Sequence, residues 1–261
     1  MTCQRFRMYE KLQKMVMQQQ MTFQGEWNEA SMGPDIRIGF VTIADFIKTN
    51  LVNVPADNYR VLRNIVFRPD MFPHPFLSSA EIKTLNRFKA LKKQIEWLSG
   101  RFAVKKLVSS AGFLPDNYSG IIIDYEPDGA PYLPEHPDLP ISISHSGGYA
   151  ACALGRNSLI KIGIDIEKIE PSGIKHIFNV AFTAREQSIL KNSSDAAVFE
   201  SWTAKEAYLK YIKKGFHESL KQVEVINGKI YHQHQSIPDA ALFSGRVNNE
   251  YALALVYPMP A

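Results

Sequence analysis

Ile160-Lys-Ile-Gly-Ile-Asp-Ile-Glu167 alternates isoleucine with charged residues or glycine, which is the period of a β-strand. Neighbouring side chains on a strand point to opposite faces, so the isoleucines form one apolar face that belongs in a core. Asp165 and Glu167 share the opposite face. The stretch therefore predicts a strand that presents two carboxylates, two residues apart, on one side of a sheet.

A helix predicted over residues 196–212 carries a third carboxylate. Trp202, Glu206 and Lys210 are spaced four residues apart, so they lie along one stripe of that helix. Carboxylates gathered together raise one another's pKa, and a hard divalent cation such as Mg²⁺ removes that cost. Glu206 and the two strand carboxylates therefore suit a magnesium site.

The sequence also allows purely structural interpretations of these residues. Asp165 and Glu167 can be the solvated face of an edge strand. Glu206 and Lys210 can form a surface ion pair one helical turn apart, which is worth only a few tenths of a kcal/mol. Lys205 and Lys210 are the two cations within sequence reach of the carboxylates.

A second polar group, Ser144-His145-Ser146, follows a predicted strand at a glycine-rich turn. A hydroxyl, an imidazole and the amides of a turn can together hold phosphate oxygens. The alternative is a turn with a surface histidine.

The remaining pattern is α+β. Ser78 with Glu81, and Thr183 with Glu186, are capping-box signals for helix starts. After the first box, apolar residues recur every three or four positions to about Leu107, which predicts one long amphipathic helix. Further strands are predicted over residues 35–43, 120–125, 141–144, 149–154 and 250–257, with a hairpin at 223–231.

These elements predict two lobes, each with helices and antiparallel strands. We expect an N-terminal extension over residues 1–34, an N-terminal lobe over 35–157 and a C-terminal lobe over 158–261 that carries the metal site. No sequence repeat relates the two lobes.

The composition narrows the class of protein. The chain has 261 residues, 45% of them apolar, and a net charge of +4. Cys3 and Cys152 are far apart, which predicts neither a disulfide framework nor a zinc site and suits a reducing cytoplasm. No apolar stretch is long enough to span a membrane, and no cluster of basic and aromatic residues suggests nucleic-acid binding.

Taken together, these segments resemble the 4'-phosphopantetheinyl transferase superfamily, in its large, Sfp-like type. The resemblance covers about residues 78–215 and is specific, because G-[IV]-D is followed some forty residues later by W-[ST]-x-K-E-[AS]-x-x-K. The segments that carry it are Ile143–Ser146, Ile162–Glu167, Phe182–Glu186 and Phe199–Lys210. It implies two pseudo-symmetric α/β lobes with the ligand in the cleft between them.

The resemblance also implies roles for individual residues. It implies Mg²⁺ ligation by Asp165, Glu167 and Glu206, coenzyme A contacts from Ser144, His145, Asp165 and Lys210, and help with the nucleotide from Arg101. Lys210 would reach the pyrophosphate. One departure is the turn Gly129-Ala130-Pro131, where many relatives have a phosphate-binding lysine in place of Ala130.

The activity implied is that of a holo-[acyl-carrier-protein] synthase. The 4'-phosphopantetheine moiety of coenzyme A would pass to a serine of an acyl or peptidyl carrier protein with Mg²⁺, releasing 3',5'-ADP. Glu206, Glu167 or a metal-bound water would be the base, and the enzyme is expected to be a cytoplasmic monomer. The alternatives are another Mg²⁺-dependent phosphoryl-transfer enzyme, or a catalytically weakened binding or regulatory protein on the same fold. The carrier and its pathway, whether fatty acid, polyketide or nonribosomal peptide, are not encoded visibly in the chain.

Overall fold

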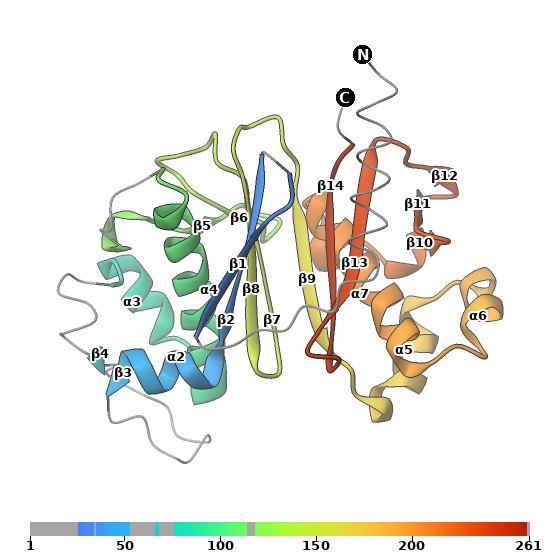
Figure 1. Cartoon of the computed structure of the whole chain (residues 1–261), viewed down its shortest axis with the longest axis horizontal. Coiled ribbons are helices and arrows are strands. Elements are labelled where there is room, and N and C mark those ends of the chain that lie inside the picture. Colours follow the sequence, from blue (N-terminus) through green and yellow to red (C-terminus); the bar gives the residue numbers. More distant parts are fainter. Residues whose placement is uncertain (1–25, 34, 53–65, 68–75, 114–117, 260–261) are drawn as a thin grey trace. The chain divides into compact units, whose positions relative to one another are not determined.

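The computed structural model describes residues 26–33, 35–52, 66–67, 76–113 and 118–259, which form two compact units (Figure 1). The described residues up to Ile160 form the N-terminal unit, and those from Lys161 form the C-terminal unit. Each unit combines helices with an antiparallel sheet, so the α+β prediction is confirmed. No described helix is both long and apolar enough to cross a lipid bilayer.

The N-terminal unit is built on a four-stranded antiparallel sheet in the order β1-β2-β8-β7. Helix α4 (Leu91–Ser110) packs against three of these strands, and its apolar side chains form one core with the sheet. The strands are β1 (Trp27–Ser31), β2 (Ile36–Thr42), β7 (Ile141–Ser146) and β8 (Tyr149–Gly155). The smaller elements are α2 (Ile43–Asn50), β3 (Leu51–Val52), β4 (Val66–Phe67), α3 (Ser79–Leu85), η1 (Tyr118–Gly120), β5 (Asp124–Tyr125) and β6 (Pro131–Tyr132).

The C-terminal unit is built on a three-stranded antiparallel sheet in the order β13-β14-β9, with helix α7 (Asp195–Tyr211) packed on it (Figure 1). The strands are β9 (Gly163–Lys168), β13 (Ala240–Val247) and β14 (Tyr251–Pro258). The other elements are η2 (Pro171–Gly173), α5 (Ile174–Ala181), α6 (Ala184–Leu190), η3 (Gly215–His217), η4 (Leu220–Gln222), β10 (Val223–Ile226), β11 (Lys229–His232) and β12 (Gln235–Ser236).

Strand β1 corrects the prediction of an extension over residues 1–34. Residues 27–31 pair along their whole length with β2, from Trp27 opposite Val41 to Ser31 opposite Arg37. The indole of Trp27 lies directly over Gly39, where a side chain would have no room. Residues 27–31 form a strand because they pair with β2, and no local sequence pattern indicated this pairing. Residues 1–25 of the predicted extension lie outside the described residues.

The predicted long helix after Ser78 is two helices, α3 and α4. Helix α3 ends at Leu85 with Asn86 as its C-cap, and the next two backbone amides form tight i→i−3 hydrogen bonds that close the turn. The side chain of Gln94 then donates to the carbonyl of Leu85 at 3.3 Å, which satisfies one carbonyl at the end of α3. The apolar repeat continues across the break, so periodicity alone could not locate it. Ile82, the first apolar residue of this repeat after the capping box, is 47% exposed.

A buried ion pair joins α3 to α4 in the N-terminal unit. Ser78 and Glu81 form the predicted capping box. The ammonium group of Lys105, which is fully buried on α4, donates to Glu81 at 2.7 Å and to the carbonyl of Phe76 at 3.0 Å. Burial lowers the pKa of Lys105, and the Glu81 carboxylate acts in the opposite direction. Glu81 therefore belongs to the capping box of α3 and also pairs with the buried lysine of α4.

The C-terminal unit contains the same arrangement with different residues. Thr183 and Glu186 form the predicted capping box of α6. Lys205 of α7, also fully buried, donates to Glu186 and to the carbonyl of Ala181, both at 2.6 Å. In both units the carbonyl belongs to the residue two positions before the helix cap. The two units thus share a structural motif, although the sequence shows no repeat.

Gly163 allows α7 to lie unusually close to β9. A Cβ atom at this position would stand 2.0 Å from the carbonyl oxygen of Ala207 and 2.4 Å from the amide nitrogen of Tyr211. The helix backbone therefore occupies the space that a side chain would need. Because both neighbours are backbone atoms, they cannot rotate away.

Substituting Gly163→Ala should destabilise the protein by about 2 kcal/mol or more, because α7 must move away from the sheet. The matched control is Gly173→Ala, where the added Cβ would meet its nearest atom at 3.8 Å. Urea unfolding of both variants measures the difference. Equal stability of the two variants would show that α7 does not need the contact at Gly163.

Replacing Lys205 with Met should cost about 3–5 kcal/mol, because the Glu186 carboxylate then stays buried without its ammonium partner. The double variant Lys205→Met/Glu186→Gln should recover part of the loss, since it removes the unpaired charge. The exposed Lys229→Met is the control. Chemical denaturation checks the series, and a Lys205→Met variant as stable as the control would contradict the buried-pair interpretation.

Candidate active site

Asp165 lies on the face of β9 that α7 covers. The close contact of Gly163 with α7 establishes which face this is, because residues 163 and 165 point the same way on a strand. Asp165 is 3% exposed and stands opposite Ala254 of β14. The small alanine leaves room for the carboxylate beneath the helix. Asp165 is therefore not part of a solvated strand face, and that simpler interpretation is wrong for this residue.

Lys210 of α7 reaches down to this carboxylate. Its ammonium group donates to Asp165 Oδ1 at 2.7 Å, and its side chain is 28% exposed. Lys210 therefore pairs with a carboxylate on the strand and is not simply the surface partner of Glu206 on the same helix. Lys205, the other cation considered near the carboxylates, is the buried partner of Glu186 instead.

Glu206 is the second carboxylate of the site and is 8% exposed. Burial and, to a lesser extent, the nearby Asp165 carboxylate raise its pKa to about 7. The ammonium group of Lys210 and a hydrogen bond from the Trp202 side chain act in the opposite direction. The spacing of Trp202 and Glu206 on one stripe predicted their proximity, but not that the indole hydrogen-bonds the carboxylate.

Glu167 shares the α7-facing side of β9 and is half-buried, opposite Ala252. The part of the chain that the structure describes gathers no group of three His, Cys, Asp or Glu side chains close enough to hold a metal ion. The carboxylates that the structure brings together are Asp165 and Glu206, and Glu167 stays a predicted ligand.

The donor set of the site fits a hard cation. Asp165 and Glu206 offer carboxylate oxygens, and their mutual repulsion is the reason that a positive charge between them would be stabilising. Mg²⁺ commonly takes one or two protein carboxylates and completes its coordination with water and phosphate oxygens. Two buried carboxylates are therefore sufficient for such a site.

The predicted phosphate contacts lie in the N-terminal unit, at the end of β7. Ser144 is buried, whereas the side chain of His145 is 37% exposed. The two are neighbours on a strand, so they point to opposite faces of the sheet. The imidazole Nδ1 of His145 faces the carboxylate of Glu96 on α4, at 3.9 Å from Oε2. No local sequence pattern links Glu96 to His145, so this contact could not be predicted from the sequence.

Arg101 occupies a buried position on α4 and is only 3% exposed. Its guanidinium stacks on the ring of Trp97 at 3.6 Å and donates to the hydroxyl of Tyr125 at 2.9 Å. These contacts give Arg101 a role in holding the β5–β6 hairpin against α4. Its predicted contact with a nucleotide stays a prediction.

The turn that carries Ala130 is formed as predicted. Gly129 has φ of +83°, and its amide donates to the carbonyl of Glu126 at 2.8 Å. The amide of Glu126 in turn donates to the carbonyl of Ala130 at 2.9 Å, which closes the β5–β6 hairpin.

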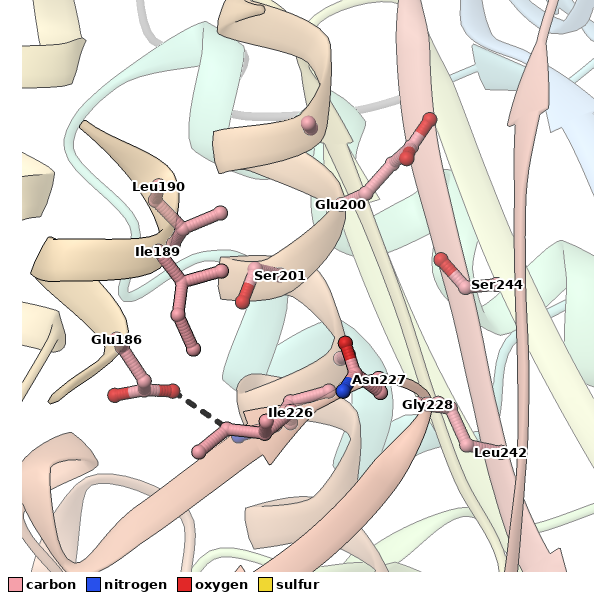
Figure 2. Close-up of a pocket in the computed structure, with 13 residues that line it drawn as sticks. Glu186, Ile189, Leu190, Glu200, Ser201, Ile226, Asn227, Gly228, Leu242 and Ser244 are labelled. Carbon is pink, nitrogen blue, oxygen red and sulfur yellow. Dashed lines mark hydrogen bonds between the residues drawn. The ribbon is translucent and has the colours of Figure 1, made fainter. Parts of the chain in front are cut away.

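A separate cavity of about 360 Å³ lies in the C-terminal unit between α6, α7, the β10–β11 turn and β13 (Figure 2). Its wall includes Ile189, Ser201 and Leu242, and Glu186 accepts a hydrogen bond from the amide of Val225 at 3.0 Å beside it. None of the predicted site residues lines this cavity. It is distinct from the Asp165–Glu206 site.

Comparison with known proteins gives a family for the C-terminal unit. Residues 161–256 match the model of the 4'-phosphopantetheinyl transferase superfamily. The transferase HetI of Nostoc sp. is 31% identical over 57% of this chain and 64% of its own length. The transferase Sfp of Bacillus subtilis is 30% identical over 54% of this chain and 62% of its own length. The chain thus spans less than two thirds of either relative.

A solved structure was also found, that of a holo-(acyl-carrier-protein) synthase from Bacillus anthracis in complex with CoA (3',5'-ADP). It is 23% identical and covers 39% of this chain and 96% of its own, with a TM-score of 0.30. The matched residues contain Asp165, Glu167, Glu206 and Lys210. Residues 161–256 of this chain are therefore similar in sequence to the 4'-phosphopantetheinyl transferase superfamily.

Proposed function

We propose that this protein transfers the 4'-phosphopantetheine moiety of coenzyme A to a serine of an acyl or peptidyl carrier protein, in a Mg²⁺-dependent reaction that releases 3',5'-ADP. The observation that carries the proposal is the buried pair of Asp165 and Glu206, with Lys210 donating to Asp165. The names of the relatives, all 4'-phosphopantetheinyl transferases, support the reaction.

Asp165 and Glu206 would hold Mg²⁺, with Glu167 as a further ligand. The ion, when bound, supplies positive charge that draws electron density from the pyrophosphate of coenzyme A. Lys210 is only partly buried, so its ammonium group can exchange Asp165 for a phosphate oxygen without leaving the site. There it stabilises the negative charge that develops on the departing 3',5'-ADP.

The serine hydroxyl of the carrier must lose a proton as it attacks the phosphorus. Glu206 and Glu167 are the two candidate acceptors of this proton among the side chains of the protein. Glu206 is 8% exposed, so bulk water has little access to its carboxylate, and Glu167 is half-buried on β9.

The remaining parts of the proposal concern the substrates. Ser144 and His145 would contact the phosphates of coenzyme A. The net charge of +4 suits an acidic carrier protein, because opposite charges speed the encounter of two proteins. The protein would act as a monomer in the cytoplasm.

Transfer activity should fall by several orders of magnitude in Asp165→Asn and Glu206→Gln, because each removes a charge from the cation site. The assay incubates the protein with apo-carrier protein, coenzyme A and Mg²⁺ and measures the mass gained by the carrier. Glu200→Gln is the matched control, because Glu200 lies on the same helix and pairs with Arg246 instead. A variant that keeps more than about a tenth of the rate, or about 1.4 kcal/mol of barrier, would remove that residue from the site.

Two further arms of this assay test the metal and the reaction class. Excess EDTA should abolish transfer, and added Mg²⁺ should restore it. If the carrier gains no mass while coenzyme A is still cleaved, the protein is a different phosphoryl-transfer enzyme. If coenzyme A is bound but not consumed, it is a binding protein on the same fold.

Glu206 should also make the stability of the metal-free protein depend on pH. Its pKa in the folded state is about 7, above the usual glutamate value of 4.5, so the folded state binds the proton more tightly. This contribution favours folding below about pH 4.5 and is lost as the pH rises to about 7. Glu206→Gln should therefore be more stable than wild type at pH 8, by on the order of 1–3 kcal/mol. The difference should be smaller at pH 5.

Thermal or urea unfolding in EDTA at the two pH values measures this effect. Glu200→Gln again serves as the control for loss of a carboxylate on α7. A wild-type minus Glu206→Gln difference that is the same at pH 5 and pH 8 would show that Glu206 titrates normally.

A further inference from the structure

We propose that the cavity between α6, α7, the β10–β11 turn and β13 binds a small uncharged molecule (Figure 2). Most of this molecule would be apolar, and one hydroxyl or amide group would hydrogen-bond the hydroxyl of Ser201. The cavity lies within the C-terminal unit, and none of the residues assigned to the transferase site lines it. Its occupancy is therefore independent of the proposed function.

The hydroxyl of Ser201 is the feature that points to a ligand. In Figure 2 the side chain of Ser201 points from α7 into the space between Ile189 of α6 and Ile226 of β10. Its Oγ atom is removed from solvent and has no hydrogen-bond partner among the described residues. A serine inside a helix usually bonds the carbonyl four residues before it or faces water, and Ser201 does neither. A buried hydroxyl without a partner is costly, so we expect a partner from outside the chain.

The rest of the wall is mainly apolar. Leu190 of α6, Ala204 of α7 and Leu242 of β13 line the cavity together with the two isoleucines. Ile226 is 7% exposed, whereas Ile189 is 50% exposed, so Ile189 lies on the solvent side of the cavity. The volume of about 360 Å³ is near the lower end of the range of small-molecule sites. These walls therefore suit a small ligand with an apolar body.

The charged groups on the wall already have partners within the protein. Glu186 accepts hydrogen bonds from the ammonium group of Lys205 at 2.6 Å and from the amide of Val225 at 3.0 Å. Glu200 pairs with Arg246 of β13. The described residues that line the cavity include no lysine, arginine or histidine. A phosphate or carboxylate would therefore enter without a cation, which is unfavourable in a largely apolar site. We expect the ligand to be uncharged for this reason.

Two further polar side chains define which uncharged groups the site can take. Asn227 of the β10–β11 turn adds an amide to the wall, and Ser244 of β13 adds a second hydroxyl. Hydroxyl and amide groups can both donate and accept hydrogen bonds. A ligand hydroxyl or amide can therefore satisfy Ser201 in either direction, whereas a hydrocarbon leaves it unpaired.

The walls of the cavity are joined by contacts that lie beside it. The bond between Glu186 and the amide of Val225 connects α6 to β10. The ion pair of Glu200 and Arg246 connects α7 to β13. Because these contacts exist without a ligand, the site is largely formed before binding, which reduces the entropy that a ligand must offset.

The cavity and the transferase site lie on opposite sides of α7. Ser201 and Lys210 are nine residues apart, which is about two and a half helical turns. A ligand at Ser201 is therefore separated from Lys210 by the helix itself. Binding in the cavity can be measured without coenzyme A, a carrier protein or transfer activity.

The first experiment titrates the whole protein with four probes and follows its backbone amides by NMR. Benzyl alcohol should give saturable shifts at Ser201, Ala204 and Asn227. Ethylbenzene, in which a methyl group replaces the hydroxyl, should bind about fivefold or more weakly, because it leaves Oγ of Ser201 unpaired. Benzoate and benzylammonium have the same ring with a charge, and both should bind more weakly than benzyl alcohol.

The second experiment repeats the titrations with variants. Ser201→Ala should bind benzyl alcohol about fivefold or more weakly and ethylbenzene unchanged, because only the hydrogen bond is lost. Ser244→Leu should abolish binding of both, because the larger side chain fills the cavity from β13. Ser236→Ala changes an exposed serine of β12 and should bind both probes as wild type does. Urea unfolding checks that each variant is folded.

Three outcomes would overturn the proposal. Benzyl alcohol that gives no saturable shift at the lining residues would mean that water alone meets Ser201. Equal affinity for benzyl alcohol in Ser201→Ala and wild type would mean that the hydroxyl does not select the ligand. Binding of a charged probe as tight as that of benzyl alcohol would contradict the expected charge of the ligand. A failed transfer assay changes none of these results, and a failed titration leaves the proposed function intact.

Discussion

The contact between the backbone of α7 and Gly163 of β9 is the constraint on which the candidate site depends. At this point the helix occupies the space that any side chain would fill. Two residues along the strand, Asp165 is thereby brought under the same helix, within reach of Glu206 and Lys210. A wider separation would admit water between the helix and the sheet, and the repulsion between the carboxylates would be screened. The close packing of α7 on β9 therefore keeps water away from Asp165 and Glu206 and leaves the repulsion between their carboxylates strong.

The main helix of each unit is fixed by a buried lysine, and this requirement explains the position of the short helix beside it. Lys105 and Lys205 are both held by the capping glutamate of the preceding short helix and by a backbone carbonyl two residues before its cap. A buried ammonium group needs several acceptors, and a helix start supplies a carboxylate and a free carbonyl together. The same physical solution appears in both units, with Ser78 at one cap and Thr183 at the other.

The charged groups of the candidate site have a different character from these structural pairs. Lys105 and Lys205 are enclosed, and their carboxylate partners are held by hydrogen bonds from the capping box. Lys210 is partly exposed, and Glu206 has a pKa of about 7. A proton can therefore bind to or leave Glu206 near neutral pH with a small change in free energy. That property is expected of a site that binds a charged substrate, and not of one that stabilises the fold.

The sequence by itself determined the features that depend on a few neighbouring residues. Both capping boxes, the strand at Ile162–Glu167, the turn at Gly129 and the family motif were readable because each is fixed by local spacing. Tertiary structure alone decided which partners these residues meet. It paired Lys205 with Glu186 and Lys210 with Asp165, placed Glu96 beside His145, and divided the predicted helix after Ser78. Apolar periodicity shows only which side of an element is buried, whereas pairing depends on how closely two elements approach, and here Gly163 on β9 sets that distance for α7.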